Sequence, residues 1–350
     1  MNPSFSHSRG QLVANFLAGS WRDKQPALDI CVSDLELVTR LLYDSGGAGL
    51  AWWRFGKSYL KTSACGELLH QGYYMQALQS AINEDRIVTA CGLLGAAGIE
   101  PILIKGWSIA RLYPHPTLRA YGDVDLLVRP SEYRAALEAL NPPDAWWVDL
   151  HSELSELEDR PIRELFECSR AVDLQGCKVR VLGPEDNLAL LAIHFFKHGA
   201  WRPSWLCDIA LTIESLPSRF DWNLCFGSNQ RQASWIASSI VLAHRLLGAQ
   251  IDAVPLSAQA REIPDWLLDA TLKQWGNLHS RDHLPVQPRP PFARSLRSPR
   301  NLLKEVRERW PDPITATFNL NGRVVAFPRF PYQIGAFALQ AGQYLLGKAS

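Results

Sequence analysis

Four short apolar segments between residues 99 and 182 constrain the fold of this chain most strongly. They occupy residues 99–104, 123–128, 146–151 and 178–182. Each is five or six residues long, which is typical of a strand, and turn residues or short helical patterns separate them. We therefore expect a small mixed sheet within an α/β unit at residues 96–183.

The sequence on both sides of this unit has the three-to-four-residue apolar spacing of helices. The segments with helical spacing are 33–44, 73–97, 131–140, 185–198, 204–216, 233–248 and 332–346. Ser131 is the expected cap of the third, and glycines follow several others. An α+β fold is therefore predicted, with a helical region at 1–95, the α/β core at 96–183, a helical domain at 184–275, and a Pro/Arg-rich arm with a final helix at 276–350.

Composition narrows the class of protein. Hydrophobic residues make up 47% of the 350 residues, enough for substantial cores, and the net charge of +1 gives no overall attraction to nucleic acid or anionic membrane. The seven cysteines lack CxxC spacing, no run of about 18 apolar residues is present, and the N-terminus does not read as a secretory signal. A soluble cytoplasmic protein without a membrane span is the expectation. The arm at 285–300 is interpreted as a linker, with contact to RNA as the alternative.

Two aspartates in the second strand are the main candidate for chemistry. Asp123 and Asp125 are two residues apart, so their side chains share one face of a strand at a Cα spacing of roughly 7 Å. Val124, Leu126 and Val128 would then pack on the opposite face. Paired carboxylates repel unless a cation lies between them, and hard oxygen ligands suit Mg²⁺ or Mn²⁺. Asp149, in the next strand, is the predicted third ligand.

A phosphate-binding turn is expected beside these carboxylates. Lys105 and Gly106 come directly after the first strand and before a short helical stretch, where backbone N–H groups meet anionic ligands. Gly106 allows close approach of the backbone, and Lys105 supplies a positive charge. Arg119 lies four residues before Asp123 and offers bidentate geometry to a phosphate. These three residues are predicted to hold a triphosphate.

Two histidines lie on one face of the helix predicted at 185–198. His194 and His198 are four residues apart, so their side chains are neighbours. A zinc site is one reading, but the segment lacks the Glu of an HExxH motif. Contact with the nucleotide is the reading we retain for function, and hydrogen-bonded structural histidines are the alternative. Asp208 is expected to pair with one of them or to be exposed.

The sequence LIKGWSIARLYPHPTLRAYGDVDLLVRP at residues 103–130 resembles the central block of the uncharacterised nucleotidyltransferase-like family within the DNA polymerase β superfamily. VDLH at 148–151 and IHFFKHGAWRPSWLCDIA at 193–210 resemble the following strand and helical block. The resemblance extends over roughly residues 30–250. It implies that Asp123, Asp125 and Asp149 bind metal. The sequence departs from the superfamily pattern in having Trp107 after Gly106 and a long segment from Gly106 to Asp123.

The first functional hypothesis is therefore an Mg²⁺-dependent (or Mn²⁺-dependent) nucleotidyltransferase. It would move a nucleoside monophosphate from a nucleoside triphosphate to a hydroxyl-bearing acceptor and release pyrophosphate. The acceptor is a small molecule, peptide or protein of unknown identity, and nucleic acid is not favoured. The rival hypotheses are a non-catalytic nucleotide-binding or scaffold module with the same fold, and a hydrolase or phosphotransferase that uses the same carboxylates.

Overall fold

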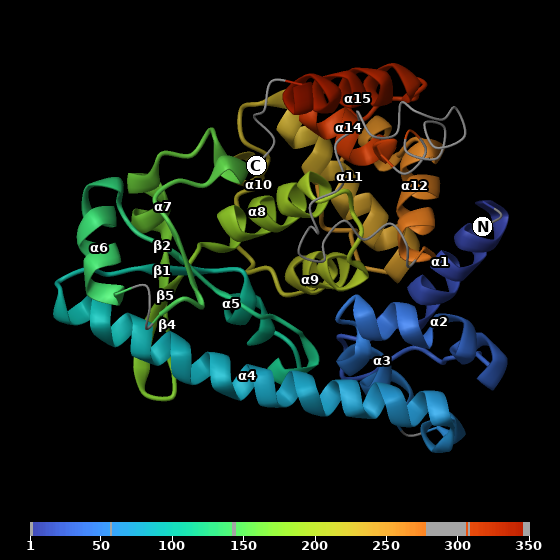
Figure 1. The fold of residues 1–350 in the computed structure, drawn as a ribbon, viewed down its shortest axis with the longest axis horizontal. Coiled ribbons are helices and arrows are strands. Elements are labelled where there is room, and N and C mark those ends of the chain that lie inside the picture. The colour runs from blue at the N-terminus through green and yellow to red at the C-terminus, as the bar shows by residue number, and fades with distance from the viewer. Residues whose placement is uncertain (1–2, 57, 142–144, 278–305, 307–308, 346–350) are drawn as a thin grey trace.

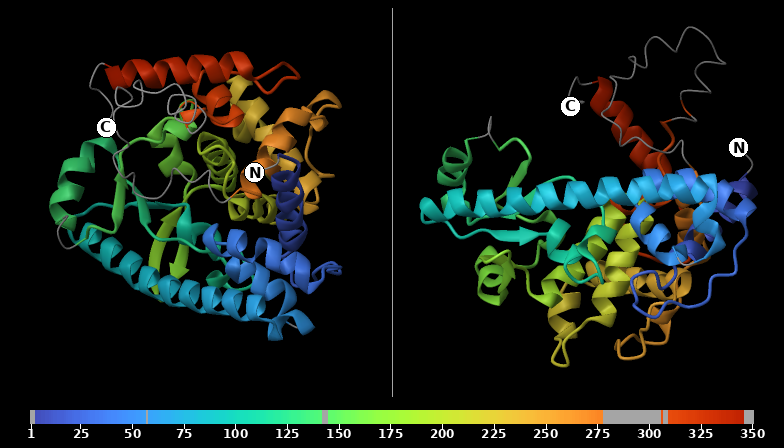
Figure 2. Two further views of the ribbon diagram at one scale, coloured as in Figure 1. Left: turned by 45° about the vertical axis from the view of Figure 1, so that its right-hand side comes forward. Right: turned by 90° about the horizontal axis from the view of Figure 1, so that it is seen from below.

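The computed structural model describes residues 3–56, 58–141, 145–277, 306 and 309–345. A single mixed sheet lies towards one end of the molecule and a group of helices lies towards the other (Figure 1). The chain begins with α1 (Pro3–Leu17), α2 (Val32–Asp44), α3 (Ala48–Phe55), the 3-10 turn η1 (Tyr59–Thr62) and the long helix α4 (Ala64–Ala96). Helix α4 runs along the outside of the molecule from the N-terminal helices to the sheet (Figure 2).

The sheet unit follows α4. Its elements are β1 (Ile102–Ile104), α5 (Gly106–Ala110), η2 (Pro116–Leu118), β2 (Val124–Leu127), η3 (Pro130–Glu132), α6 (Tyr133–Leu140), β3 (Val148–His151), η4 (Ser155–Leu157), α7 (Ile162–Cys168), β4 (Arg170–Leu174) and β5 (Cys177–Val181). The strand order is β3-β2-β1-β5-β4. Strands β2–β3 and β1–β5 pair in parallel, whereas β1–β2 and β4–β5 pair antiparallel. The predicted α+β fold with a mixed sheet is confirmed.

The second half of the described chain is helical. It contains α8 (Pro184–Lys197), α9 (Pro203–Glu214), α10 (Trp222–Phe226), α11 (Gln230–Leu247), η5 (Gln259–Arg261), α12 (Asp265–Trp275), α14 (Pro313–Asn319) and α15 (Phe330–Leu345). Local sequence explains several boundaries. Asn229 caps α11 by accepting from the N–H groups of Arg231 and Gln232, and Gly248 ends that helix at φ 70°.

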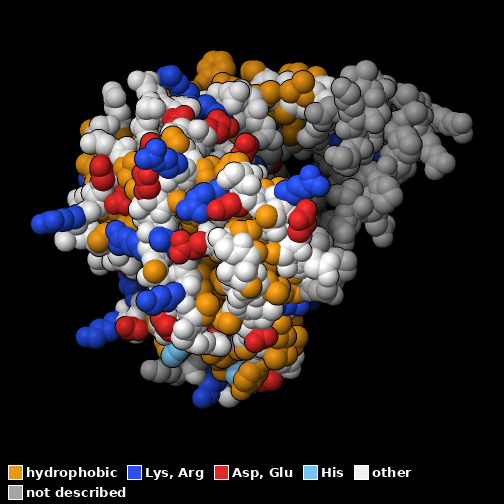
Figure 3. Space-filling model, turned by 90° about the vertical axis from the view of Figure 1, so that its left-hand side faces the viewer, with side chains coloured by type: hydrophobic (Ala, Val, Ile, Leu, Met, Phe, Trp, Pro, Cys, Tyr) orange, Lys and Arg blue, Asp and Glu red, His pale blue; other side chains and the backbone are white. Residues whose placement is uncertain are grey.

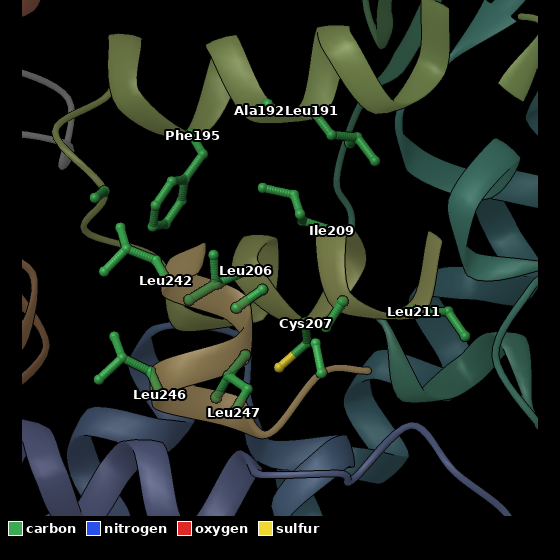
Figure 4. Packing of buried hydrophobic residues seen from close by; sticks show 14 of the residues in the cluster. Leu191, Ala192, Phe195, Leu206, Cys207, Ile209, Leu211, Leu242, Leu246 and Leu247 are labelled. Carbon is green, nitrogen blue, oxygen red and sulfur yellow. The ribbon is translucent and has the colours of Figure 1, made fainter. Parts of the chain in front are cut away.

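Two hydrophobic clusters hold these elements together. The larger joins the N-terminal helices to α8, α9, α11 and α12, and it includes Phe195, Leu206 and Leu242, which point towards one another between α8, α9 and α11 (Figure 4). The smaller lies between the sheet and the helices α4 and α6. The predicted domain boundaries at 95, 183 and 275 remain predictions, and the N-terminal and C-terminal helices share one core.

The two faces of the sheet belong to different clusters, and this places the candidate site. Val124, Leu126 and Val128 pack in the smaller cluster, under α4 and α6, as the alternation predicts. Leu127 packs in the larger cluster instead. Asp125 alternates with Val124 and Leu126, so its side chain lies on the face shared with Leu127, towards the C-terminal helices.

Two details of the sequence-based description differ in the structure. Ser131 lies in the turn η3, and the residue that precedes α6 is Glu132, because Pro130 begins a separate 3-10 turn first. Strand β4 was not expected, since its residues are mostly exposed and their sequence gives no continuous apolar run. No helix among the described residues is long and apolar enough to cross a membrane. The arm at 285–300 falls outside the described residues.

Candidate active site

Strand pairing brings the predicted residues of three strands side by side. In the antiparallel pair β1–β2, Ile104 lies opposite Asp125. Lys105 is the next residue after Ile104, so the turn that carries it begins beside Asp125. In the parallel pair β2–β3, Asp125 lies opposite Asp149. Residues directly opposite each other in neighbouring strands point to the same face. The sheet therefore presents both carboxylates on one face, next to the turn that carries Lys105.

Asp125, Asp149 and His151 form the close group of this site. One ligand atom from each lies within 4.8 Å of the others. Nε2 of His151 is 3.2 Å from Oδ1 of Asp125 and 3.2 Å from Oδ2 of Asp149. Nζ of Lys105 is 3.0 Å from Oδ1 of Asp125. Asp125 is buried, whereas the side chain of Asp149 is 56% exposed, so the group opens to solvent on its Asp149 side.

The charges of this group are coupled. Burial by itself raises the pKa of Asp125, but the hydrogen bond from His151 and the ammonium group of Lys105 outweigh it, so the pKa is lower than usual. The hydrogen bond to Asp125 raises the pKa of His151 against the effect of burial, and the charges of Asp149 and Asp125 raise it further. Because carboxylates can only accept, Nε2 of His151 carries the proton in this arrangement.

His151 was not among the predicted site residues. It follows Asp149 by two positions, so the two side chains share a face of β3, and this spacing was the available signal. Asp123 lies one residue before β2 and is exposed. Among the described residues, the group held within 4.8 Å does not include Asp123. Its role as a metal ligand therefore stays a prediction.

The turn after β1 has an unusual backbone. Lys105 has φ 54° and ψ −149°, and Gly106 has φ 43°. A positive φ is common for glycine but strained for lysine, and such strain persists where the surroundings hold the residue in place. The backbone N–H and the hydroxyl of Ser108 both donate to the carbonyl oxygen of Lys105, at 2.8 and 2.6 Å. Helix α5 is only five residues long, so the predicted binding of an anion at this turn depends on the charge of Lys105 rather than on a helix dipole.

A second charged cluster connects η4 to α8. Oε1 of Glu156 lies 3.1 Å from Nζ of Lys197 and 3.5 Å from Nδ1 of His194. Burial raises the pKa of Glu156, but His194 and Lys197 together lower it well below its usual range, and Lys105 adds to the effect. Burial lowers the pKa of His194, which also interacts electrostatically with Lys105 and Asp125. The charges of Lys105 and Asp125 in the first cluster therefore also act on the groups of the second cluster.

The two predicted histidines are neighbours, as their spacing implied. The ring centroids of His194 and His198 are 4.4 Å apart, and Trp205 packs edge-on against both. Their contact with a nucleotide remains a prediction. Glu156 and Lys197 were missed. Lys197 was visible as the basic residue between the two histidines, but nothing in the sequence placed Glu156 beside it.

Arg119 lies in a buried ion pair. Its Nη2 is 2.9 Å and its Nε 3.1 Å from Oδ2 of Asp208, and the hydroxyl of Tyr113 donates to Oδ1 of Asp208 at 2.8 Å. Asp208 is fully buried and Arg119 is 6% exposed. The expectation that Asp208 would pair with a histidine or be exposed was wrong, because Arg119 and Tyr113 supply its partners. Binding of a triphosphate by Arg119 stays a prediction.

The donor set fits a divalent cation. Asp125 and Asp149 contribute carboxylate oxygens from adjacent strands, the ligands that Mg²⁺ and Mn²⁺ prefer. His151 adds an imidazole nitrogen, a donor more typical of transition metals, and it must lose its proton to act as a ligand. The set is therefore suited to a cation held mainly by the two carboxylates, with His151 beside them.

The surface around the sheet has mixed charge. On the face shown in Figure 3, the Lys and Arg side chains of the described residues are interspersed with Asp and Glu. Proteins that track a nucleic-acid backbone use a continuous basic stripe or patch. The mixed charge of this face gives no support to nucleic acid as a partner there.

Comparison with known proteins assigns the chain to a family. A family model described as an uncharacterised nucleotidyltransferase matches residues 33–145 and 142–248. The two stretches together cover more than half of the 350 residues and include β1, β2, β3 and α8. No curated protein and no solved structure matched the chain. The chain belongs to this uncharacterised nucleotidyltransferase family.

Proposed function

We propose that this protein is a metal-dependent nucleotidyltransferase. It moves a nucleoside monophosphate from a nucleoside triphosphate to a hydroxyl-bearing acceptor. The observation that carries the proposal is the juxtaposition of Asp125, Asp149 and His151 within 4.8 Å, with Lys105 at 3.0 Å from Asp125, in a chain of a nucleotidyltransferase family. Paired carboxylates beside a lysine are the residue types that bind a metal–triphosphate complex.

In the reaction, the acceptor oxygen forms a bond to the α-phosphorus, the bond from that phosphorus to the bridging oxygen breaks, and pyrophosphate leaves. Asp125 and Asp149 would hold Mg²⁺ or Mn²⁺, with Asp123 as the predicted additional ligand. The cation, when bound, supplies charge neutralisation for the phosphates. Asp149 is half-exposed, so it can also accept the proton of the acceptor hydroxyl.

The lysines and histidines act on the triphosphate. Lys105 offers its ammonium group to a phosphate oxygen, and the tight turn at Gly106 lets the backbone approach the same anion. His194, on α8, and His198, at the C-terminal end of that helix, contact the nucleotide. Arg119 is proposed to add positive charge near the triphosphate while its guanidinium group stays paired with Asp208. Positioning and charge neutralisation, rather than covalent chemistry by the protein, drive this type of transfer.

The test is pyrophosphate release from each of the four nucleoside triphosphates, with Mg²⁺ or Mn²⁺ and with cell extract as the source of acceptor. Release above the extract alone is expected, and the double variant Asp123→Ala/Asp125→Ala is expected to abolish it. Arg163→Ala is a matched control, since Arg163 is exposed on α7 and pairs only locally with Glu167. Undiminished release by the double variant would sink the assignment.

A second candidate is a nucleotide-binding module without turnover. It is favoured by one observation: Lys105 and His151 already compensate the charge of Asp125 within the chain. Calorimetry with ATP, GTP, CTP and UTP, with and without Mg²⁺, separates the two candidates. Tight binding without pyrophosphate release in any extract favours the module, whereas release that depends on Asp125 favours the enzyme.

A further inference from the structure

The solvent-facing side of α4 is apolar in its middle. Tyr74, Met75, Leu78 and Ile82 are between 41% and 61% exposed, and Ala81 lies among them. No charged residue occurs between positions 68 and 83 of the sequence. We call these five residues the α4 strip. Scattered exposed apolar residues need no explanation, but a contiguous strip along one helix face indicates an interaction surface.

The inward side of the same part of α4 is polar. Gln76 accepts from the backbone N–H of Gly49 at 2.9 Å and donates to the carbonyl oxygen of Gly46 at 3.2 Å. Asn83 donates to the carbonyl oxygen of Tyr121 at 3.0 Å. An ordinary surface helix buries its apolar side and exposes its polar side. Here the polarity is reversed, and packing among the described residues does not account for the apolar residues of the strip.

The spacing of the strip fits a helix as its partner. Met75, Leu78 and Ile82 are three and four residues apart, the spacing with which one helix packs along another. A membrane surface fits less well, because α4 has no Lys or Arg before Arg86 to attract anionic lipids. The strip is also bounded by polar residues at both ends, Gln71 and Asp85.

We propose that a second copy of this chain packs its α4 antiparallel against the α4 strip, about a two-fold axis beside Leu78. In that arrangement Leu78 meets Leu78, and Met75 of each copy meets Ile82 of the other. Gln71 of one copy faces Asp85 of the other, so no like charges oppose each other. An isologous contact of this kind requires a self-complementary surface, which the strip provides.

The size of the contact suits a reversible dimer. Tyr74, Met75, Leu78 and Ile82 are between 41% and 61% exposed, so together they offer roughly 400 Å² of surface per chain if a free side chain of this size exposes about 200 Å². This is about half of the roughly 800 Å² per partner of a standard interface, a size that fits a weak, reversible dimer. In the part of the chain that the structure describes, no other element lies over the outer side of α4, so the second helix can approach (Figure 2).

The test is sedimentation velocity of the full chain at rising concentration, for the wild type, Leu78→Glu and Leu339→Glu. Leu78 and Leu339 are both 57% exposed, and Leu339 lies on α15, so Leu339→Glu makes the same change at an equally exposed position away from the α4 strip. We expect a wild-type dimer at micromolar concentrations. Leu78→Glu weakens it roughly 100-fold or more, because it places two carboxylates in an apolar contact, whereas Leu339→Glu leaves it unchanged. Circular dichroism checks that both variants remain folded.

Cross-linking tests the orientation. Met75→Cys/Ile82→Cys is expected to form a disulfide-linked dimer on mild oxidation, whereas either single variant is not, with the wild type as the control for its own cysteines. A wild type that stays monomeric overturns the proposal, as does a dimer that survives Leu78→Glu or one that Leu339→Glu dissociates. The proposal is also overturned if the monomeric wild type floats with anionic vesicles and Leu78→Glu does not. That result would assign the α4 strip to a membrane contact.

Discussion

The buried pair of Arg119 and Asp208 allows the most quantitative prediction. Asp208 has no exposed surface, and it accepts three hydrogen bonds from Arg119, at 2.9 to 3.2 Å, and one from Tyr113 at 2.8 Å. Asp208→Ala leaves a buried guanidinium group and a buried hydroxyl without their acceptor. Removal of one partner of a buried pair costs about 3–5 kcal/mol, and we expect a loss in the free energy of unfolding of that size.

The double variant Arg119→Met/Asp208→Leu gives the contrasting result. Apolar side chains of similar volume replace both charges, which is often neutral or stabilising, and only the buried hydroxyl of Tyr113 loses its acceptor, at a cost of about 1–3 kcal/mol. We therefore expect a free energy of unfolding within about 3 kcal/mol of the wild type. Urea unfolding of the wild type, Arg119→Met, Asp208→Leu and the double variant, followed by circular dichroism, measures the coupling between the two residues. If the loss in the free energy of unfolding of the double variant equals the sum of the losses of the two single variants, the reasoning is refuted.

The same four proteins separate structural and nucleotide-binding roles for Arg119. Calorimetry with Mg²⁺ and the preferred nucleoside triphosphate shows whether the folded double variant binds less tightly than the wild type. A loss of about 10-fold or more supports contact of the Arg119 charge with the bound triphosphate. Unchanged affinity assigns Arg119 to the fold alone.

Three further outcomes follow from single residues. His151→Gln is expected to lower stability most below about pH 6.5, because the positive charge of the protonated ring is attracted to both carboxylates. The stability gap to the wild type closes as pH rises through the raised pKa of His151 and the ring loses that charge. Urea midpoints near pH 6 and pH 9 in EDTA measure the gap, and a gap independent of pH refutes the reasoning. Lys105→Gly should be about 1 kcal/mol more stable than Lys105→Ala in urea unfolding, because glycine adopts a positive φ without strain. Both variants should bind Mg·ATP about 10-fold more weakly than the wild type by calorimetry, because both lack the ammonium group. Equal stability of the two variants would refute the backbone strain at residue 105. Gly10→Ala places a Cβ 1.9 Å from the carbonyl oxygen of Leu272, so α1 and α12 must move apart. We expect the free energy of unfolding to fall by about 1–3 kcal/mol. A thermal midpoint equal to that of the wild type would contradict this close contact.

Much of the fold could be predicted from local patterns. The strands at 99–104, 123–128, 146–151 and 178–182 correspond to β1, β2, β3 and β5, because short apolar runs bounded by turn residues are distinctive. Strand β4 has mostly exposed residues and depends on pairing with β5, which local sequence does not encode. The helix expected at 73–97 begins earlier, at Ala64, where Ser63 caps it by accepting from the N–H of Gly66.

The residues of the candidate site could be predicted where strand order brings them together. The prediction was incomplete where contacts between distant segments bring them together. Asp149 was expected beside Asp125 from strand order, and the register pairs them. Glu156 reaches His194 through a contact between η4 and α8 that no periodicity predicts. Arg119 was interpreted by its distance from the aspartates along the chain, but tertiary packing places it against Asp208, 89 residues away.

The most direct test of the central claim follows the two ends of the triphosphate. Cell extract, Mg²⁺ and the nucleoside triphosphate labelled at the α- or the γ-phosphate are incubated with the wild type and with Asp125→Asn/Asp149→Asn. We predict that the wild type transfers the α-label to an acceptor and releases the γ-label in pyrophosphate, and that the variant does neither. Transfer of the γ-label, its release as orthophosphate, or undiminished α-label transfer by the variant would contradict nucleotidyl transfer at Asp125 and Asp149.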